Sequence, residues 1–511
     1  MSATATSIDP HRDARPPEHV DVLIVGAGIS GIGTAYHLQS RHPGKSYAIL
    51  EGREALGGTW DLFRYPGIRS DSDLPTLGYK FKPWTGDAAL ADGPAILDYI
   101  EETAVENGID RRIRFGHHVK SASWSTEEGR WTVVAERVAD GESVTVTCGW
   151  LFGACGYYRY DQGYTPEFEG RERFRGEIVH PQHWPEDLDY AGKRVLVIGS
   201  GATAVTIVPV IAERAEQVTM LQRSPSYVIS IPSKDAIANL MRRWFGDERG
   251  HRLARRKNIW MQRTIFRTSR RRPRLIRRLI RALQRRQLPD DYPIDPHFNP
   301  DYDPWDQRLC LVPDGDLFRA ISDGSVEVVT DRIETFTETG VQLQSGAELE
   351  AEIIVTATGL DLLAFGGIEL CVDGEDVVLS ETTAYRGMML SNVPNFAFAI
   401  GYTNASWTLK VDLTGEYFCR LLDYMHSEGV DQCVPVPGPD LQRRPLLDFD
   451  AGYVQRSIDR FPRQGDRGPW QLSMDYDADA RSLGADPVND GAVRFSRTVG
   501  AVDRRELEPV G

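Results

Sequence analysis

The chain has 511 residues, of which 26% are charged and 41% are hydrophobic, and its formal net charge is −15 at pH 7. This length predicts two or three domains with sizeable hydrophobic cores, and the acidic balance argues against general nucleic-acid binding. The six cysteines show neither a CxxC spacing nor a Cys/His ligand spacing, so they predict reduced thiols in a cytoplasmic protein and no metal site.

The N-terminal residues carry no targeting pattern. Residues 1–19 hold charges and prolines but no apolar core, and we therefore expect a disordered tail and no secretory signal. Polar residues interrupt even the apolar stretch at 388–401, and no uninterrupted apolar run approaches the roughly 20 residues of a membrane span. We expect no membrane-spanning helix.

Three glycines follow a short apolar run at residues 21–25, which predicts a buried parallel strand that ends in a phosphate-binding turn. Gly26 permits the tight turn, Gly28 lets the backbone approach a pyrophosphate, and Gly31 allows the helix to pack closely on the strand. We expect that helix over residues 29–40, with its N-terminus directed at the phosphates. The pattern predicts the first half of a dinucleotide-binding fold.

A carboxylate at the end of the second predicted strand narrows the choice of nucleotide. This strand covers residues 47–50, and Glu51 follows it. A carboxylate here accepts hydrogen bonds from both ribose hydroxyls and repels a 2′-phosphate. The first fold therefore suits FAD or NAD, and its N-terminal position, with Gly57 and Gly58 following, favours FAD.

Four further segments are predicted to belong to the first sheet. Residues 115–119 and the alternating residues 131–135 are typical of sheet strands, and residues 151–156 indicate the strand that closes the first nucleotide-binding section. Residues 395–402 indicate a strand and turn by which the chain returns to this unit. We therefore expect the first unit to be built from two separate stretches of the chain.

A second pattern of strand, glycine turn and helix begins at residues 194–198. Gly199 and Gly201 take the first two glycine positions, and Ala204 takes the third, where a small residue suffices. The next predicted strand, at residues 218–221, leads into a sequence without an acid. The chain therefore has two nucleotide-binding folds, and the second differs from the first at the ribose position.

Arg223 and Ser224 stand in the second fold where Glu51 stands in the first. Arg223 follows Gly199 by 24 residues, and Glu51 follows Gly26 by 25 residues. The planar guanidinium holds a phosphate by two hydrogen bonds, and the serine hydroxyl adds a third. This pattern favours NADPH over NADH, although a surface arginine without a ligand is the alternative interpretation.

Residues 241–286 differ in composition from the rest of the chain. They contain 18 basic residues and two acids, so the remainder has a net charge near −31. Apolar residues at 275, 276, 279, 280 and 283 predict a helical stripe. Two interpretations stay open, namely an inserted helical subdomain with a solvated basic face, and a peripheral contact with an anionic membrane or an acidic partner.

Two longer motifs carry a family resemblance. The residues between the two folds follow the spacing FxGxxxHxxxW and then proline, namely Phe174, Gly176, His180, Trp184 and Pro185. This motif, with a second one at residues 57–71, resembles type I Baeyer–Villiger monooxygenases from about residue 20 to about residue 470. Segments 62–73 and 404–410 are similar to the subgroup of the ethionamide-activating monooxygenase. The first motif also fits a structural linker with a buried His and Trp, and both interpretations agree because this family's motif organises domain motion.

The resemblance implies a set of FAD contacts in the first fold. It places residues 59–71 over the flavin, assigns Asp71 rather than Asp73 to the flavin site, and brings the backbone of Val119 to the adenine. Trp60 is equally open to interpretation as a core aromatic, and the two acids as solvated loop carboxylates. The implied FAD contacts are Gly26, Gly28, Ser30, Gly31, Glu51, Thr59, Trp60, Asp61, Leu62, Asp71 and Val119.

The resemblance also implies NADPH contacts and an active-site arginine, Arg308. The family often has a lysine directly before this arginine, where it contributes to NADPH phosphate binding, but this chain has Gln307. The departure shifts phosphate binding to Arg223 and Ser224. The implied NADP contacts are Arg69, Ser70, Gly199, Ser200, Gly201, Ala202, Thr203, Ala204, Arg223 and Ser224.

The predicted architecture is an α/β fold with two Rossmann-like dinucleotide-binding domains, one for FAD and one for NADPH, and an inserted helical subdomain. We expect the FAD-binding domain at residues 20–165 and 385–511. The NADPH-binding domain is expected at residues 166–384, with the helical insertion at about 232–298.

The implied reaction inserts one atom of O2 next to a ketone carbonyl to give an ester or lactone, with sulfide oxidation as a side activity. NADPH reduces FAD, O2 adds at flavin C4a, and Arg308, oriented by Asp71, stabilises the peroxyflavin anion. The partners are O2 and a small ketone or sulfide, and no nucleic acid takes part.

Two other functions stay open. An N- or S-hydroxylating flavin monooxygenase also has two such folds, but a fingerprint ending in Trp184 and Pro185 favours the Baeyer–Villiger reaction. A flavin-dependent reductase or redox-sensing binding protein would make no oxygenated product. A disulfide reductase would be expected to carry a CxxC motif, which the sequence lacks.

Overall fold

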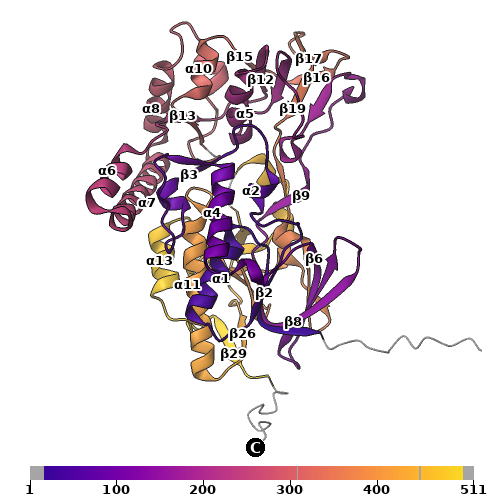
Figure 1. Cartoon of the computed structure of the whole chain (residues 1–511), viewed down its shortest axis with the longest axis vertical. Coiled ribbons are helices and arrows are strands. Elements are labelled where there is room, and N and C mark those ends of the chain that lie inside the picture. The colour runs from indigo at the N-terminus through magenta and orange to yellow at the C-terminus, as the bar shows by residue number, and fades with distance from the viewer. Residues whose placement is uncertain (1–16, 308, 448–449, 499–511) are drawn as a thin grey trace, which may run out of the picture.

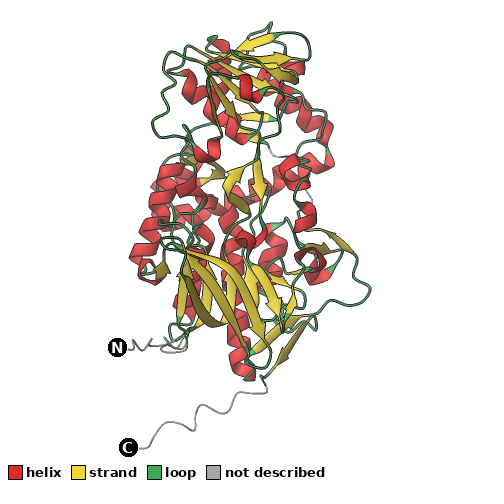
Figure 2. Ribbon diagram, turned by 90° about the vertical axis from the view of Figure 1, so that its right-hand side faces the viewer, coloured by secondary structure: helices red, strands yellow, loops and turns green. Residues whose placement is uncertain are grey.

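The computed structural model describes residues 17–307, 309–447 and 450–498, which form two units stacked along the long axis (Figures 1 and 2). Of the tail expected at 1–19, residues 1–16 lie outside the described residues. Glu18 and His19 belong instead to β1 (Glu18–Val25), where they pair with Val146 and Thr147. Because the side chains of Glu18 and His19 are exposed, hydrophobicity gave no signal for this part of the strand.

The first unit contains an 11-stranded sheet among the described residues, at the bottom of Figure 1. The first strand β1 lies between β8 and β2, and all three are parallel. The other strands of this sheet are β2 (Tyr47–Leu50), β5 (Ile113–Arg114), β6 (His117–Ser125), β7 (Arg130–Arg137), β8 (Ser143–Gly153), β21 (Glu369–Val372), β22 (Glu375–Asp376), β23 (Ala384–Tyr385), β24 (Met389–Leu390) and β25 (Phe396–Phe398).

Alternate residues of β1 pack into two different cores, because successive side chains of a strand point to opposite faces of the sheet. Val22 and Ile24 join the core on the helical face, and Leu23 and Val25 join the core on the other face. The helices of the first core are α1 (Ile29–Arg41), α4 (Gly93–Glu106) and α11 (Trp407–Glu428).

The C-terminal part of the chain completes the first unit. The strand expected near residues 395–402 is β25, which pairs in parallel with β8. Helix α11 packs on α1, and the ring of Phe418 lies 5.2 Å from Trp150 and 5.3 Å from Phe152, measured between ring centroids. The sheet of the first unit is therefore completed by a strand that comes much later in the chain, since Phe396 of β25 pairs with Leu151 of β8.

The second unit, at the top of Figure 1, is built on a five-stranded parallel sheet in the order β10-β19-β11-β12-β15. The predicted strands at 194–198 and 218–221 are β11 and β12, and helix α5 (Ala202–Ala212) follows the glycine turn between them. Together the two sheets and their helices confirm the predicted α/β class. The five strands are β10 (Glu177–Val179), β11 (Arg194–Ile198), β12 (Gln217–Gln222), β15 (Val326–Thr330) and β19 (Ile353–Thr356).

Helices fill the region where we expected a helical insertion, and they form one flank of the molecule, at the left of Figure 1. Among the described residues, no helix is both long enough and apolar enough to cross a membrane. The helices are α6 (Ala236–Phe245), α7 (Asp247–Arg271), α8 (Pro273–Arg285) and α9 (Ile294–Phe298).

The apolar stripe predicted on α8 has two rows that face different surroundings. Ile280 is buried and Ile276 is half-buried against a small core, whereas Leu275, Leu279 and Leu283 are exposed. The predicted stripe is therefore helical, but only its inner row packs on the protein.

Buried polar contacts fasten α7 to the first unit. Arg255 of α7 forms an ion pair with Asp412 of α11 at 3.1 Å and donates a hydrogen bond to the carbonyl of Pro75 at 3.1 Å. One turn further along α7, the Asn258 amide donates to the Asp73 carboxylate at 2.7 Å. Helix α7 of the insertion lies in the chain between β12 and β15, two strands of the second unit. It is nevertheless docked on the first unit.

We expect Arg255→Ala to destabilise the protein by about 3–5 kcal/mol, because it leaves the buried Asp412 carboxylate with only the His37 ring and the backbone N–H of Lys80 as partners. Arg256→Ala is the matched control, since Arg256 is the next residue and is exposed, and it should change stability by no more than about 0.5 kcal/mol. Denaturant unfolding followed by tryptophan fluorescence measures both. Equal stability of the two variants would show that the ion pair does not hold α7 in place.

Candidate functional site

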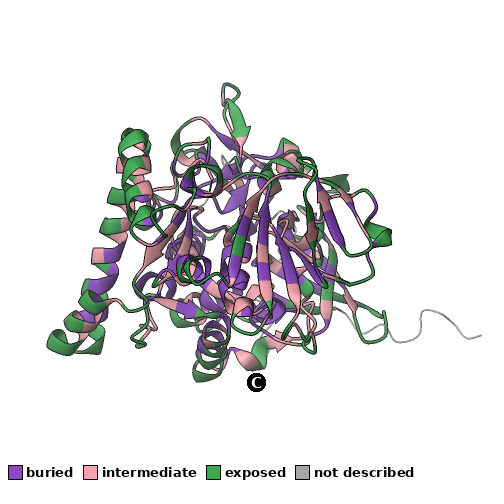
Figure 3. Cartoon of the chain, turned by 90° about the horizontal axis from the view of Figure 1, so that it is seen from above, coloured by how far each residue is buried: buried purple, intermediate pink, exposed green. Residues whose placement is uncertain are grey.

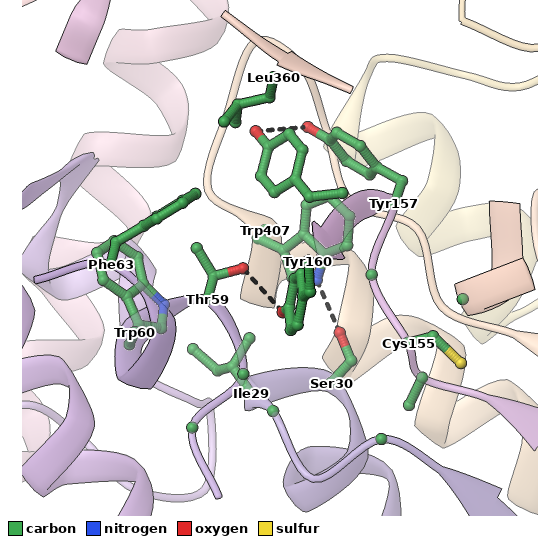
Figure 4. A pocket seen from close by; sticks show the side chains of 18 of the residues that line it. Ile29, Ser30, Thr59, Trp60, Phe63, Cys155, Tyr157, Tyr160, Leu360 and Trp407 are labelled. Atoms are coloured by element: carbon green, nitrogen blue, oxygen red, sulfur yellow. Dashed lines mark hydrogen bonds between the residues drawn. The ribbon is translucent and has the colours of Figure 1, made fainter. Parts of the chain in front are cut away.

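A cavity of about 790 Å³ lies where the first unit meets the first turn of α5 (Figure 4). Its size is within the range of about 300–1,000 Å³ that is usual for ligand sites. Many of the residues predicted to bind a nucleotide line it, namely Gly26, Gly28, Ser30, Glu51, Thr59, Trp60, Arg69, Ser70, Asp71, Val119, Ala202 and Thr203.

The turn after β1 has no room for side chains. Gly26 has a φ of +103°, and a Cβ atom there would lie 2.7 Å from the carbonyl oxygen of Ala154. A Cβ atom on Gly31 would lie 1.9 Å from the carbonyl oxygen of Gly26, so α1 packs directly on the turn. Gly28 caps α1 without a side-chain hydrogen bond, which leaves the first N–H groups of the helix directed at the cavity.

Glu51 is buried at the end of β2, as the sequence predicts for a ribose-binding acid. Its carboxylate accepts hydrogen bonds from the backbone N–H groups of Ala27 at 2.7 Å and Arg53 at 3.0 Å. Burial raises the pKa of Glu51, and the two backbone hydrogen bonds oppose this effect. Glu51 thereby braces the glycine turn while remaining part of the cavity wall.

An aromatic wall of tyrosine and tryptophan side chains forms part of the cavity lining. We did not predict these side chains from the sequence. The Tyr160 and Thr59 hydroxyls lie 3.2 Å apart, and the Trp407 indole donates a hydrogen bond to the Ser30 hydroxyl at 2.8 Å (Figure 4). Burial raises the pKa of Tyr160 to about 12, so the phenol stays protonated at neutral pH. Three tyrosines within residues 157–160, directly after the predicted closing strand, were the available signal.

The segment at residues 59–71 divides between the cavity and the protein interior. Asp61 is not among the residues lining the cavity, because its carboxylate pairs with Arg53 and Arg64. Leu62 packs instead in the core of the second unit. Asp71 does line the cavity, and together with burial it raises the pKa of the Tyr65 phenol.

The second glycine turn, like the first, has no room for a side chain at its first glycine, but it lies outside the cavity wall. Gly199 has a φ of +145°, and a Cβ atom there would lie 2.3 Å from the carbonyl oxygen of Ala357. Arg223 and Ser224 are exposed, and the Ser200 hydroxyl donates to the carbonyl of Ser224 at 2.9 Å. The predicted residues Gly199, Ser200, Gly201, Ala204, Arg223 and Ser224 are therefore outside the cavity wall, and their role in NADP binding stays a prediction.

The expected active-site arginine, Arg308, lies outside the described residues. The chain beyond it enters β14 (Cys310–Pro313). Arg69, which lines the cavity, donates to the carbonyl of Leu311 at 3.5 Å and pairs with Asp316 at 3.2 Å. The strand that follows position 308 therefore runs beside the cavity wall.

Most fingerprint residues pack within the second unit, and Gln182 in the same segment reaches the first unit. A Cβ atom on Gly176 would lie 2.2 Å from the carbonyl oxygen of Glu352, and Phe174 and Trp184 pack in cores of the second unit. The Gln182 amide donates to the carbonyl of Arg159 at 2.8 Å, in the strand β9 (Tyr158–Gly163) beside the cavity. Pro185 accepts a backbone hydrogen bond from Leu188.

Both ring nitrogens of His180 are engaged. The backbone N–H of Gln182 can only donate, so Nδ1 accepts at 3.1 Å, and Nε2 therefore carries the proton and donates to the carbonyl of Gly359 at 3.2 Å. Burial lowers the pKa of His180, although the Gly359 contact opposes the shift. A neutral ring held by two hydrogen bonds suits a positioning role between the units.

Sequence comparisons agree with this geometry. The sequence matches the NAD(P)-binding Rossmann-like domain family over residues 24–79 and the flavin-binding monooxygenase-like family over residues 90–373. It is 55% identical over 482 residues to the FAD-containing monooxygenase EthA of Mycobacterium tuberculosis, covering 94% of this chain and 98% of that protein. It is 51% identical over 487 residues to EthA of Mycolicibacterium smegmatis, covering 95% and 99%.

Solved structures share the fold. A steroid monooxygenase bound to NADP matches with a TM-score of 0.73 and 24% identity, over 94% of this chain and all of that one. Cyclohexanone monooxygenase from Rhodococcus sp. Phi1, bound to NADP+, matches with a TM-score of 0.73 and 20% identity over the same shares. The chain belongs to the flavin-binding monooxygenase-like family. The predicted resemblance and the predicted class, a flavin monooxygenase, are confirmed.

We expect His180→Ala to lower kcat/KM for oxygenation roughly 10- to 100-fold, because small displacements between the units misplace the reacting groups. The pH profile should keep its shape between pH 6 and 8.5, since a lowered pKa leaves His180 neutral at and above its usual value of about 6.5. The exposed neighbour His183 provides the control His183→Ala, which should retain activity. Loss of a titration near pH 6.5 in His180→Ala alone would instead indicate acid–base catalysis.

Proposed function

We propose that the chain is an FAD-dependent monooxygenase that consumes NADPH and inserts one oxygen atom of O2 next to a ketone carbonyl, giving an ester or lactone. The observation that carries the proposal is the pair of glycine turns, at Gly26 and Gly199, joined by the fingerprint segment beside one cavity. The similarity to FAD-containing monooxygenases and the NADP-bound structures of similar fold support it. Sulfides are a second substrate class for the same site.

The first unit fits FAD. The turn at Gly26 has no room for a Cβ atom, and Glu51 is buried at the ribose position. The uncapped N-terminus of α1 favours a pyrophosphate, and Val119 lines the same cavity. In this proposal the FAD-binding domain comprises residues 20–165 and 385–511.

The second unit fits NADPH. In this proposal the NADPH-binding domain comprises residues 166–384, with the insertion at about 232–298, apart from β21, β22 and the first residue of β23, which belong to the sheet of the first unit. Arg223 is exposed and forms no ion pair with a carboxylate of the described residues. Arg456, whose guanidinium lies 3.4 Å over the Tyr164 ring, has its pKa lowered by burial and, to a smaller extent, by Arg223. The effect of Arg223 on Arg456 indicates that the two cations are neighbours, and two neighbouring cations suit a 2′-phosphate. Arg456 supplies a positive charge that Gln307 does not.

The chain holds charge and excludes water around the flavin. Bound FAD, once reduced by NADPH, supplies the chemistry that activates O2. In this proposal Asp71 orients Arg308, and the permanent charge of the guanidinium stabilises negative charge that develops during oxygen transfer. The aromatic wall at Tyr157, Tyr160 and Trp407 keeps the cavity apolar, which strengthens that interaction.

The runner-up is an N- or S-hydroxylating flavin monooxygenase. Such an enzyme needs the same two nucleotide sites, so the glycine turns do not separate the two reactions. The fingerprint does favour oxygen insertion, since it ends in Trp184 and Pro185. The products decide between the two reactions.

We expect the purified protein to release FAD on denaturation and to incorporate one 18O atom from 18O2 into esters or lactones. The test incubates the enzyme with NADPH and a panel of linear, cyclic and aromatic ketones and identifies products by mass spectrometry. Label confined to N- or S-oxides would establish the runner-up, and peroxide without a labelled product would contradict any oxygenase function.

In the same assay, Arg308→Ala should consume NADPH but yield peroxide in place of ester. A normal ester yield per NADPH from this variant would remove Arg308 from its assigned role.

We expect Arg223→Ala to raise KM for NADPH much more than KM for NADH. Losing a charge-assisted phosphate contact costs on the order of 1.5–3 kcal/mol, or roughly 10- to 150-fold. Steady-state kinetics with both cofactors measures the effect. Arg214→Ala is the control, because Arg214 is exposed and precedes β12, whereas Arg223 follows it. Equal losses with NADPH and NADH would place Arg223 away from the 2′-phosphate.

A further inference from the structure

Exposed apolar side chains gather on the insertion. Leu275, Leu279 and Leu283 follow one another at intervals of four residues on α8, and Leu279 is 54% exposed. The opposite row of α8 packs on the protein, because Ile280 and Gln284 are buried against the second unit. The outer row therefore has no partner among the described residues.

The neighbouring helices repeat this arrangement. On α6, Leu240 and Trp244 are spaced by four residues and are 43% and 70% exposed. On α7, Leu253 and Trp260 are spaced by seven residues, two helical turns, and are 39% and 60% exposed, while the buried side of that helix carries Arg255 and the other contacts with the first unit. We call these exposed apolar rows on α6, α7 and α8 the outer face. Figure 3 shows the flank that they form, with exposed residues on its outer side.

The outer face is also strongly basic. Several arginines of the insertion are neutralised within the protein, for example Arg267 by Asp475 and Arg281 by Asp295. Others are exposed and form no ion pair with any carboxylate among the residues described, including Arg243, Arg252, Arg256, Arg274, Arg278 and Arg285. Apolar rows and unpaired arginines are thus interleaved on the same helices.

We infer that the outer face binds the interface of an anionic phospholipid bilayer, with the helices lying in the plane of the membrane. Amphipathic helices with Lys or Arg beside Trp and Leu bind at this depth, and their affinity combines apolar burial with attraction to acidic headgroups. The rest of the chain, with a net charge near −31, is repelled by the same surface. This asymmetry orients the protein with the insertion towards the lipid.

Charge argues against a second copy on the outer face, and the apolar rows argue against a nucleic acid. A second copy placed on it by two-fold symmetry would bring one set of unpaired arginines against the other. A nucleic acid would satisfy the arginines but would leave the rows of leucine and tryptophan without apolar contacts. The membrane contact does not depend on the proposed reaction, because the outer face is separate from the cavity residues.

Co-sedimentation of the full-length, FAD-loaded protein with large unilamellar vesicles tests the inference. We expect at least tenfold tighter binding to vesicles containing 30% phosphatidylglycerol than to pure phosphatidylcholine, and loss of binding in 0.5 M salt. Trp244 and Trp260 should give a blue shift of the fluorescence on binding. Equal binding to both vesicle types, or none to either, would overturn the inference.

Paired variants separate the apolar and the electrostatic contributions. Leu275→Gln/Leu279→Gln and Arg274→Glu/Arg278→Glu should each weaken vesicle binding at least tenfold. The controls are Val105→Gln/Val378→Gln, at positions 64% and 52% exposed outside the insertion, and Arg111→Glu/Arg171→Glu, also exposed. All eight positions are exposed, so unfolding midpoints should match the wild type.

Two results from these variants would contradict a membrane surface. Vesicle binding that survives both insertion variants would place the lipid contact elsewhere. A dimer in sedimentation velocity without vesicles that the Leu275→Gln/Leu279→Gln variant abolishes would show that the outer face pairs with a second copy. Unchanged turnover of soluble substrate in the variants is expected, and it keeps this test independent of the oxygenase assay.

Discussion

The structure depends on the absence of side chains at two turns where a parallel strand passes into a helix. At Gly26 and at Gly199 the neighbouring backbone approaches so closely that a methyl group would collide with a carbonyl oxygen. This close approach lets α1 and α5 begin directly at the strand ends, with uncapped N-termini. The cavity, the position of Glu51 and the open second turn all follow from these two contacts.

The junction between the units is held by polar groups that have little freedom. Gln182 reaches the carbonyl of Arg159, and His180 reaches that of Gly359, so a short segment is bonded to both the first and the second unit. On the other side of the molecule, Arg255 and Asn258 fasten the insertion to the first unit. The relative placement of the two nucleotide sites is therefore set by these hydrogen bonds together with the apolar contacts of Leu62, Phe63 and Tyr65, which pack in the core of the second unit.

The sequence predicted those parts of the fold and site that depend on local pattern. The strand at 47–50 and the turn at Gly26 follow from an apolar run and glycine spacing, and the structure has both. Residues whose role depends on distant neighbours were not predictable in this way. Trp407 reaches Ser30 from a stretch 377 residues away, and Arg255 of α7 reaches Asp412, 157 residues away. The local sequence contains no sign of either contact.

The return of the chain to the first unit has a consequence for how the protein is made. Strand β8 leaves the ribosome long before its neighbour β25. Trp150 and Phe152 therefore lack their contacts with Phe418 until α11 has been synthesised. During synthesis the part of the first sheet that β25 and α11 complete therefore stays uncovered while the whole second unit is translated. A nascent chain in this state exposes strand edges and core side chains, and it is the stage at which aggregation competes with folding and at which chaperones act.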